Sequence, residues 1–286
     1  TATRVNSVGL IVPVVANLAR INYLTSGGTP FILDEPQTTN LNTFSEDFTN
    51  ASYSKTRSTI SSNVTLSPDG NNTADKLIAT TDNNSHQVSK TYNNTVGSVV
   101  SFSVFVKKSE LIYCQLRIID NPTNNGGTQN VFNALYDLQN GVITSTLESG
   151  VVNSLNPFSS IKSFNNDWYR CEIGFTKSSS QARTDIAIFT SISPTALGNP
   201  LYIGNNVDGI FIFGAQLEEK AATSYIPTLA SAVTRNADVI TVAPPSGTVK
   251  ITTTFSNNTT QVITSIPALF TLPEGLIKQV LMQNSL

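Results

Sequence analysis

The residues best suited to binding a ligand are polar and aromatic residues that alternate with apolar ones along two segments. If the two segments are neighbouring strands, these residues lie on one face of a sheet. Aromatic rings would then stack on the apolar face of a sugar, while guanidinium, amide and carboxylate groups would bind its hydroxyls. The candidate glycan-binding residues are Tyr113, Gln115 and Arg117 in the first segment and Trp168, Arg170 and Glu172 in the second.

The same residues also suit a packing role. Aromatic and arginine side chains are enriched where proteins contact one another. This face is therefore expected either to bind a glycan or to pack on the N-terminal segment or on another copy of the chain. The many Thr and Asn residues do not separate these alternatives, because short uncharged side chains are cheap to order on either kind of surface.

Pairs of adjacent acids are the candidates for hydrolytic chemistry. A glycosidase needs two carboxyl groups facing each other across a cleft. Neighbouring residues on a strand point to opposite faces, so neither acid of a pair can assist the other. We therefore predict that the chain is not an enzyme. The pairs are Asp34-Glu35, Glu46-Asp47 and Glu218-Glu219.

A calcium site is the one cofactor that the acids leave open. Hard cations accept carboxylate and carbonyl oxygens, and Glu46, Asp47 and Asp208 offer such ligands. No other cofactor is expected, because the chain has a single histidine, His86, and two cysteines. We expect His86 to lie on the surface at the start of a strand. Cys114 and Cys171 fall on inward faces, where they are either buried thiols or a disulfide between facing strands.

Composition excludes several classes of protein. The chain has 286 residues, a formal net charge of −2 and only 13% charged residues. Nothing in this balance would attract nucleic acid or an anionic membrane. No apolar run reaches the ~18–20 residues of a membrane helix. The sequence has no secretory signal. Since it starts at Thr1 without an initiator Met, we expect either a processed product or, as the favoured alternative, a piece of a longer protein.

Short alternating segments separated by turns predict an all-β fold. Segments 101–106, 111–119 and 168–175 each place apolar residues on one face only, which is typical of antiparallel sheets with one packed face. Turn signals such as Asn140-Gly141 and Asp208-Gly209 separate them. The predicted fold class is an antiparallel jelly roll or β-sandwich. The predicted inward sets include Phe102, Val104, Val106; Cys114, Leu116, Ile118; Tyr169, Cys171, Ile173; and Phe211, Phe213, Ala215, Leu217.

Three parts are expected along the chain. Residues 1–41 resemble an extended N-terminal arm, since proline and glycine interrupt their apolar runs. Residues 42–236 form the jelly-roll domain. Residues 237–286 form a small C-terminal β element with strands at 248–255, 261–266 and 275–282. Three strands are the minimum for independent stability, so the element is expected to lean on the main domain or on another subunit.

An ordered series of phrases resembles a known family. The series is NLNTFSEDFTN at 40–50, SPDG at 67–70, TADKL at 73–77, SFSVFVK at 101–107, DWYRC at 167–171, FGAQLE at 213–218 and TSYIPT at 223–228. It is similar to the carbohydrate-binding-module-like jelly roll found in structural proteins of tailed bacteriophages. The segments ATRVNS at 2–7 and LDEPQ at 33–37 are similar to the arm that precedes that module. The family often has an Asp-Asp pair in the last strand that helps hold calcium. Gly214-Ala215 stands there in this chain, which puts an inherited calcium site in doubt.

The resemblance implies a virion component that is assembled in the bacterial host cytoplasm. It would be a tail fibre, tail spike or head fibre, often trimeric, with other virion proteins as partners. The leading expectation is an adhesive, receptor-binding role in host attachment through surface glycans. The alternatives are a purely structural decoration or connector protein without glycan binding and, less favoured, a spike that degrades polysaccharide.

Overall fold

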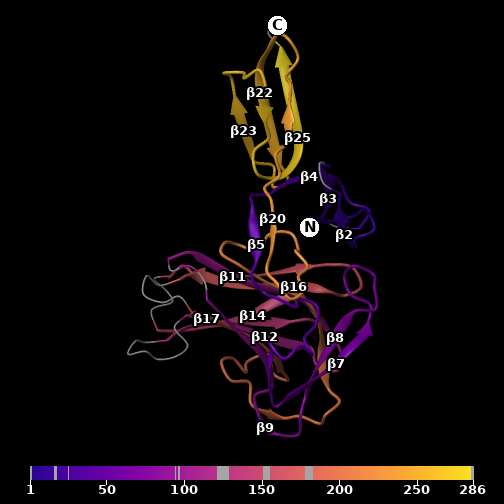
Figure 1. Ribbon diagram of the computed structural model, residues 1–286, viewed down its shortest axis with the longest axis vertical. Helices are drawn as coiled ribbons and strands as arrows, with labels where there is room; N and C mark the ends of the chain where they lie inside the picture. The colour runs from indigo at the N-terminus through magenta and orange to yellow at the C-terminus, as the bar shows by residue number, and fades with distance from the viewer. Residues whose placement is uncertain are drawn as a thin grey trace. The chain divides into compact units, whose positions relative to one another are not determined.

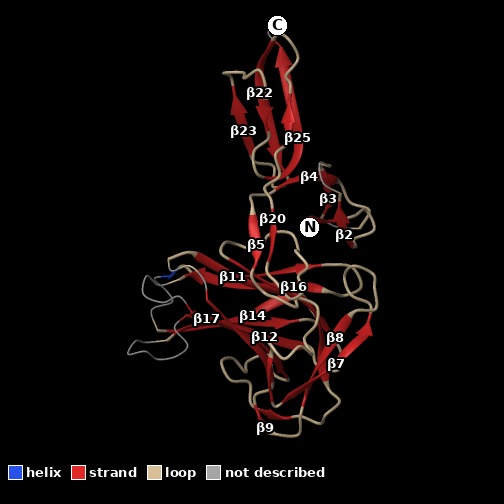
Figure 2. Ribbon diagram, viewed as in Figure 1, coloured by secondary structure: helices blue, strands red, loops and turns tan. Residues whose placement is uncertain are grey.

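The computed structural model describes residues 2–15, 18–24, 26–93, 95, 97–120, 129–150, 155–177 and 183–284. Antiparallel strands dominate it, as Figure 2 shows, and the predicted all-β sandwich class is confirmed. The chain divides into two compact units. We call Thr39–Ala222 with Pro227–Val233 the sandwich unit, and Thr1–Thr38 with Thr223–Ile226 and Thr234–Leu286 the discontinuous unit. No helix among the described residues has the length and apolarity needed to cross a membrane.

The sandwich unit is built from two six-stranded antiparallel sheets, and Figure 1 labels several of their strands, among them β11, β12, β16 and β17. The first sheet has the order β14-β13-β12-β17-β10-β6, and its strands are β6 (Ser54–Thr56), β10 (Gln87–Asn93), β12 (Tyr113–Asp120), β13 (Asn130–Asp137), β14 (Val142–Ser149) and β17 (Arg183–Ser191). The second sheet has the order β15-β16-β11-β19-β8-β7. Its strands are β7 (Ser58–Thr65), β8 (Ala74–Ala79), β11 (Val99–Lys108), β15 (Phe158–Ser163), β16 (Tyr169–Thr176) and β19 (Gly209–Glu218). The short strands β9 (Asn83–Asn84) and β18 (Tyr202–Ile203) pair with each other.

The inward faces of the two sheets form one hydrophobic core. Alternate residues of β11 and β16, such as Phe102 and Ile173, meet alternate residues of β12, such as Leu116, in the same buried cluster. The predicted inward sets of these three strands are thereby confirmed. Cys114 and Cys171 both lie in this core as free cysteines, and burial raises the pKa of each thiol.

Strand β19 departs from the predicted alternation. Ala215 and Leu217 face the core as expected, but Ile210 and Ile212 occupy the inward positions nearer the start of the strand. The prediction that Phe211 and Phe213 face inward is therefore wrong. The pairing of β19 with β11 shifts register here, and Gly214 adopts a φ of 63°. A bulge of this kind reverses which residues face inward, because it adds one residue to one strand.

The discontinuous unit contains a five-stranded sheet of order β23-β22-β25-β4-β3. Ile251, Phe270, Leu272 and Ile277 form a buried hydrophobic cluster in this unit. The strands predicted near the C-terminus are present. The sheet comprises β3 (Arg20–Tyr23), β4 (Pro30–Asp34), β22 (Thr248–Phe255), β23 (Thr260–Ile263) and β25 (Gly275–Asn284), beside the pairs β1 (Ala2–Val5) with β2 (Ile11–Val14) and β21 (Thr241–Val242) with β24 (Phe270–Thr271). The chain passes between the units in β5 (Thr38–Asn40) and β20 (Val233–Arg235).

The N-terminal segment pairs with the C-terminal segment of the same chain. Leu33 of β4 lies opposite Leu276 of β25, and Ile32 lies opposite Ile277. Ile11 and Phe31 are buried without a second subunit, at 6% and 9% exposure. Residues expected to form an extended arm are thus strands of a compact unit that includes the C-terminal strands.

Candidate functional site

The six predicted glycan-binding residues do not share one face. Tyr113, Gln115 and Arg117 belong to β12, which pairs with β13 and β17 in the first sheet. Arg170 and Glu172 belong to β16, which pairs with β11 and β15 in the second sheet. Because the inward faces of the two sheets meet, the outward residues of β12 and β16 lie on opposite sides of the sandwich. The prediction of a joint six-residue face is therefore wrong.

Trp168 is also placed differently from the prediction. It lies one residue before β16 and is fully buried, with its indole Nε1 donating to the Leu66 carbonyl at 3.0 Å. Strict alternation does not extend to it, since Asn166 and Asp167 just before it adopt φ values of 58° and 60° in a turn. A buried indole of this kind supports packing and presents no ring to a sugar.

Arg170 and Glu172 are occupied by contacts within the sandwich unit. Arg170 Nη2 donates to Ser103 Oγ at 2.9 Å, and its guanidinium lies 5.4 Å from the centre of the Phe105 ring. The Glu172 carboxylate accepts from Ser160 Oγ and from the Ala222 amide, each at 2.8 Å. These contacts fit the packing alternative for the second segment.

Gln115 and Arg117 hold a loop against the outer face of the first sheet. We call this loop, residues 192–201 after β17, the strap. The fully buried Gln115 amide binds both backbone groups of Gly198: Nε2 donates to its carbonyl and Oε1 accepts from its N–H, each at 2.8 Å. Arg117 Nη2 donates to the same carbonyl and to Asn199 Oδ1.

The guanidinium of Arg117 is fixed from three sides. Its Nε donates to Asn133 Oδ1 at 2.8 Å, and its plane lies 4.6 Å from the centre of the buried Phe189 ring. Burial lowers the pKa of Arg117, although a guanidinium stays protonated in proteins. Nη1 has no hydrogen-bond partner among the described residues and remains a donor for a ligand.

A pocket opens beside Arg117 on the same outer face. We call it the polar pocket. Its volume is about 120 Å³. Residues of the adjacent strands β12, β17 and β10 line it: Arg117 and Ile119; Asp185, Ile186 and Ala187; and Gln87, Ser89, Lys90 and Thr91. The register explains the hollow, since Arg117 lies opposite Ala187 and Ala187 lies opposite Ser89. Two small side chains therefore follow the large arginine across the sheet.

Two acceptor oxygens at this pocket are buried without a hydrogen-bond donor. They are Gln87 Oε1 and Asp185 Oδ1. Asp185 Oδ1 has an ion-pair contact with Arg183 Nε at 3.5 Å, and Arg183 Nη2 donates to Thr91 Oγ1 at 3.3 Å. A buried polar atom without a hydrogen bond costs about 1–3 kcal/mol, and such atoms in native proteins need an explanation such as water or a ligand. Each of the two atoms exposes less than 1 Å², so neither is open to a ligand in the pocket.

The three acids considered for calcium are not brought together. Asp47 is exposed and accepts from the Thr49 amide at 3.0 Å and from Thr49 Oγ1 at 2.5 Å. Asp208 follows a turn in which its amide donates to Asn205 Oδ1 at 2.8 Å. Within the described ranges no three His, Cys, Asp or Glu residues gather closely enough to hold a metal ion, and this includes Glu46.

His86 is buried, so the prediction of a surface histidine is wrong. Its Nδ1 lies 2.5 Å from the Arg57 carbonyl and its Nε2 lies 3.1 Å from the Tyr202 carbonyl. The ring also contacts the Tyr202 ring at 4.7 Å between centres. The polar turn before His86 predicted exposure, but the imidazole instead joins β18 to the loop before β7.

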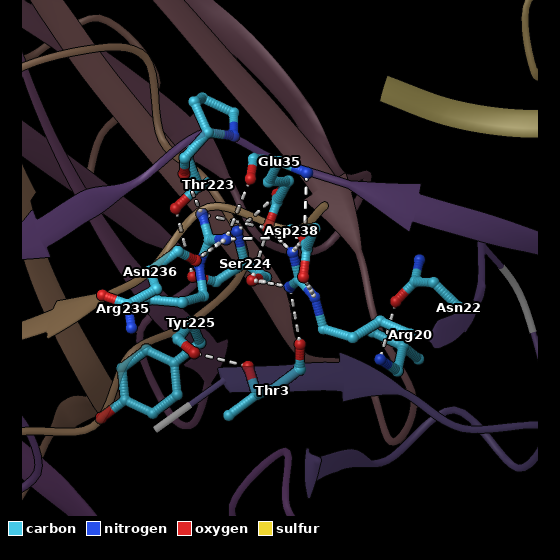
Figure 3. Close-up of polar contacts among 12 residues, drawn as sticks. Thr3, Arg20, Asn22, Glu35, Thr223, Ser224, Tyr225, Arg235, Asn236 and Asp238 are labelled. Atoms are coloured by element: carbon cyan, nitrogen blue, oxygen red, sulfur yellow. Dashed lines mark hydrogen bonds and ion pairs between the residues drawn. The ribbon is translucent and has the colours of Figure 1, made fainter. Parts of the chain in front are cut away.

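A buried charged cluster lies in the discontinuous unit, where arginines pair with carboxylates of the same unit (Figure 3). Arg20 is 1% exposed. Its guanidinium donates to both Asp238 carboxylate oxygens, to the Thr3 carbonyl at 3.0 Å and to Ser224 Oγ at 2.7 Å, and it pairs with Glu35 at 2.9 Å. Arg235 pairs with the same two carboxylates at 3.4 and 3.7 Å. This cluster has the character of a structural hub.

Comparison with known proteins finds structural similarity at low sequence identity. No protein-family model and no curated protein matches the chain. Similar solved structures include the CBM22-1–GH10 modules of Clostridium thermocellum endo-1,4-β-D-xylanase 10B, complexed with xylohexaose, at 11% identity and a TM-score of 0.39 over 68% of this chain and 30% of that one. The enzymatically active domain of tailspike protein 4 from bacteriophage CBA120 is similar at 14% identity and a TM-score of 0.34, over 62% of this chain and 21% of that one. TmCBM27, a carbohydrate-binding module for specific mannan recognition, is similar at 12% identity and a TM-score of 0.32, over 65% of this chain and 99% of that one.

Of the three strands that line the polar pocket, the sequence analysis identified a residue on β12 and none on β10 or β17. Arg117 was a candidate, whereas Gln87, Ser89, Thr91 and Asp185 were not. The alternation of polar and apolar residues in QVSKTY at 87–92 carried a usable signal for an outward polar face. No pattern in the sequence predicted the strand order, in which β17 lies next to β12 and β10 lies next to β17.

Proposed function

We propose that this chain is the adhesive part of a bacteriophage fibre or spike and that the polar pocket binds a glycan of the host surface. The observation that supports this most is the pocket itself, which is lined by the Arg117 guanidinium and by the hydroxyl side chains of Ser89 and Thr91. Sugar hydroxyls donate and accept hydrogen bonds, so they match both kinds of group. The virion setting is proposed from the resemblance of the sequence to phage structural proteins.

Multivalency would make such a site effective. A pocket of about 120 Å³ is smaller than the roughly 300–1,000 Å³ of most ligand sites, so each copy would bind weakly. Homotrimerisation, which we propose along with virion partners, would raise the effective concentration of the remaining sites after the first one binds. We propose no metal cofactor for this binding.

A printed array of bacterial surface polysaccharides tests the proposal. The wild-type chain should bind at least one polysaccharide, and Ser89→Tyr, which fills the pocket, should abolish that signal. Ser160→Tyr is the matched control, because Ser160 is exposed on β15 at the edge of the opposite sheet. The proposal fails if the wild type binds nothing, or if Ser89→Tyr binds as well as the control while both keep the wild-type circular dichroism spectrum.

A purely structural decoration or connector role is the second candidate. The contacts of Trp168, Arg170 and Glu172 favour it for the second sheet, since these residues support packing. An array without signal, together with a stable oligomer in analytical ultracentrifugation, would support this role. Polysaccharide cleavage is disfavoured, because Asp185 is the only carboxylate in the described lining of the pocket and a glycosidase needs two. Release of reducing ends from a bound polysaccharide would contradict that view.

A further inference from the structure

We infer that the polar pocket takes the carboxylate group of an acidic sugar, with Arg117 as the residue that contacts this group. The inference rests on the proposed function, since it names the ligand class of the same pocket. It makes the charge of a polysaccharide, in addition to its ring type, a feature that the chain distinguishes.

Arg117 carries a positive charge without a counter-ion and has one unused donor. Its Nε and Nη2 donate to the side-chain oxygens of Asn133 and Asn199 and to the Gly198 carbonyl, all of which are neutral acceptors. In the part of the chain that the structure describes, no carboxylate lies within ion-pair distance of this guanidinium. Burial lowers the pKa of Arg117, and no acid contributes in the opposite direction. An anionic ligand would supply the missing partner.

The Arg117 guanidinium is also held in one orientation before a ligand binds. It lies 4.6 Å from the centre of the Phe189 ring, and its hydrogen bonds to Asn133 and to the strap fix the plane. A group that is already ordered loses little freedom on binding. Hydrogen bonds from a guanidinium to a carboxylate are stronger than those to a neutral acceptor. At Nη1 an acid group therefore has an advantage over a hydroxyl group.

Asp185 does not cancel this preference. Its carboxylate has an ion-pair contact with Arg183 Nε at 3.5 Å. It also lies opposite Ile119 on β12, two residues along that strand from Arg117, and so does not face Arg117 directly. The formal charges of Arg117, Arg183 and Asp185 are +1, +1 and −1, which leaves a net charge of +1 beside the pocket. The local field thus attracts an anion.

The lining on β10 and β17 suits the hydroxyl groups next to the acid. Ser89 lies opposite Ala187, and Ala187 lies opposite Arg117, so the three form one row across the sheet. Neighbouring strands are about 4.8 Å apart, which places the two ends of the row roughly 10 Å apart over the methyl group of Ala187. A sugar carboxylate at Arg117 would leave ring hydroxyls directed toward Ser89. A phosphate group carries up to about two negative charges at pH 7, so a carboxylate matches the single net positive charge better.

Titration calorimetry with matched small sugars tests the inference. The probes are the methyl glycosides of glucuronic and galacturonic acid, the corresponding uronamides, and the neutral methyl glycosides of glucose and galactose. A uronamide has nearly the shape of the acid but no charge. For at least one ring type, the acid should bind the wild-type chain about tenfold more tightly than its uronamide. Arg117→Gln should reduce that preference to about twofold or less, since it removes the charge.

Two control variants separate the charge from other effects. Asn199→Ala removes a strap contact of the same guanidinium and keeps the charge, so the preference for the acid should persist. Arg4→Gln removes an equal charge from an arginine of the discontinuous unit that makes one exposed hydrogen bond, and it should also keep the preference.

Two results would overturn the inference. One is that the wild type binds a neutral sugar or a uronamide as tightly as the acid, in which case the proposed glycan binding still stands. The other is that Arg117→Gln keeps the full preference together with the wild-type circular dichroism spectrum. Absence of binding by every probe would count against the proposed function and the inference together.

Discussion

Removal of the Arg20 guanidinium should unfold the discontinuous unit while the sandwich unit stays folded. Arg20 is 1% exposed, and its guanidinium contacts two carboxylates, one hydroxyl and one carbonyl. In Arg20→Met the methionine keeps most of the side-chain length but removes the charge. Asp238 and Glu35 then have Arg235 as their remaining cation, at 3.7 Å from Asp238 and 3.4 Å from Glu35. Breaking a buried ion pair by removing one partner costs roughly 3–5 kcal/mol.

That cost is large for this particular unit. One hydrophobic cluster of the unit contains four buried residues, and Ile11, Phe31 and Leu33 are buried outside that cluster. A whole domain is stable by about 5–15 kcal/mol, and a unit with so small a core belongs near the low end of that range. A loss of roughly 4 kcal/mol therefore leaves little or no margin.

Hydrogen exchange resolved by peptide is the assay. In Arg20→Met, peptides covering β4 and β25 should lose protection, whereas peptides covering β11 and β16 should keep it. Arg4→Met is the matched control, because Arg4 lies in the same segment but makes a single exposed hydrogen bond, from Nη1 to the Ile21 carbonyl. The reasoning is refuted if Arg20→Met and Arg4→Met lower the protection of β4 equally. It is also refuted if each substitution lowers the free energy of unfolding by less than about 1 kcal/mol.

Three further predictions concern stability. Burial, with help from the Asp238 and Glu274 charges, raises the pKa of Asp34 to about 6, and Asp34 Oδ2 has no donor. Between about pH 4 and pH 6 the folded state therefore keeps the Asp34 proton that the unfolded state has released. The free energy of unfolding falls as the pH rises through this range, because an ionised Asp34 carboxylate is unfavourable in the folded state. Asp34→Asn should become more stable relative to the wild type across that window, by up to ~3 kcal/mol in urea unfolding, and an unchanged difference from pH 4 to pH 7 would contradict this. Burial lowers the pKa of Lys90 to about 8, inside a ring of Phe44, Tyr53 and Tyr92. The wild type should therefore gain stability between about pH 8 and pH 10.4, where only the unfolded state stays protonated, and this gain should be absent in Lys90→Met in matched denaturation curves. Finally, a Cβ on Gly209 would lie 2.1 Å from the Leu77 carbonyl oxygen, so Gly209→Ala should lower the thermal midpoint of the sandwich unit by overpacking, at a cost of ~1–3 kcal/mol. Gly97→Ala, where nothing lies within 4 Å of the added atom, is the comparison for backbone strain alone, and equal midpoints would contradict the steric argument.

The alternation of apolar residues was sufficient to predict the strands and most of the core. It succeeded for β11, β12 and β16 because each is a regular strand with one face in the interior. It failed at β19, where Gly214 shifts the register, and at Trp168, where a turn precedes the strand. Both errors have one cause. Alternation with a period of two predicts which face of the sheet a side chain lies on only while the backbone stays extended.

Pairings between distant segments were beyond the reach of local patterns. The position of β12 next to β17, and of β16 in the other sheet, follows from the total packing of the sandwich unit. The same holds for the pairing of β4 with β25, whose partners Leu33 and Leu276 are far apart in sequence. The candidate site depended on such pairings, and for that reason Arg117 was identified while Asp185 and Ala187 were not.

The pairing of β4 with β25 also has a consequence for biosynthesis. A ribosome delivers β4 before the sandwich unit and β25 after it, so the sheet that needs both strands must wait until the sandwich unit has emerged. The residues between them include both sheets of the sandwich unit, which have all their partners sooner and can fold first, as domains generally do during synthesis. Strands β3 and β4 would then remain without their final neighbour until β25 is made, and exposed strand edges are prone to pair wrongly during that interval.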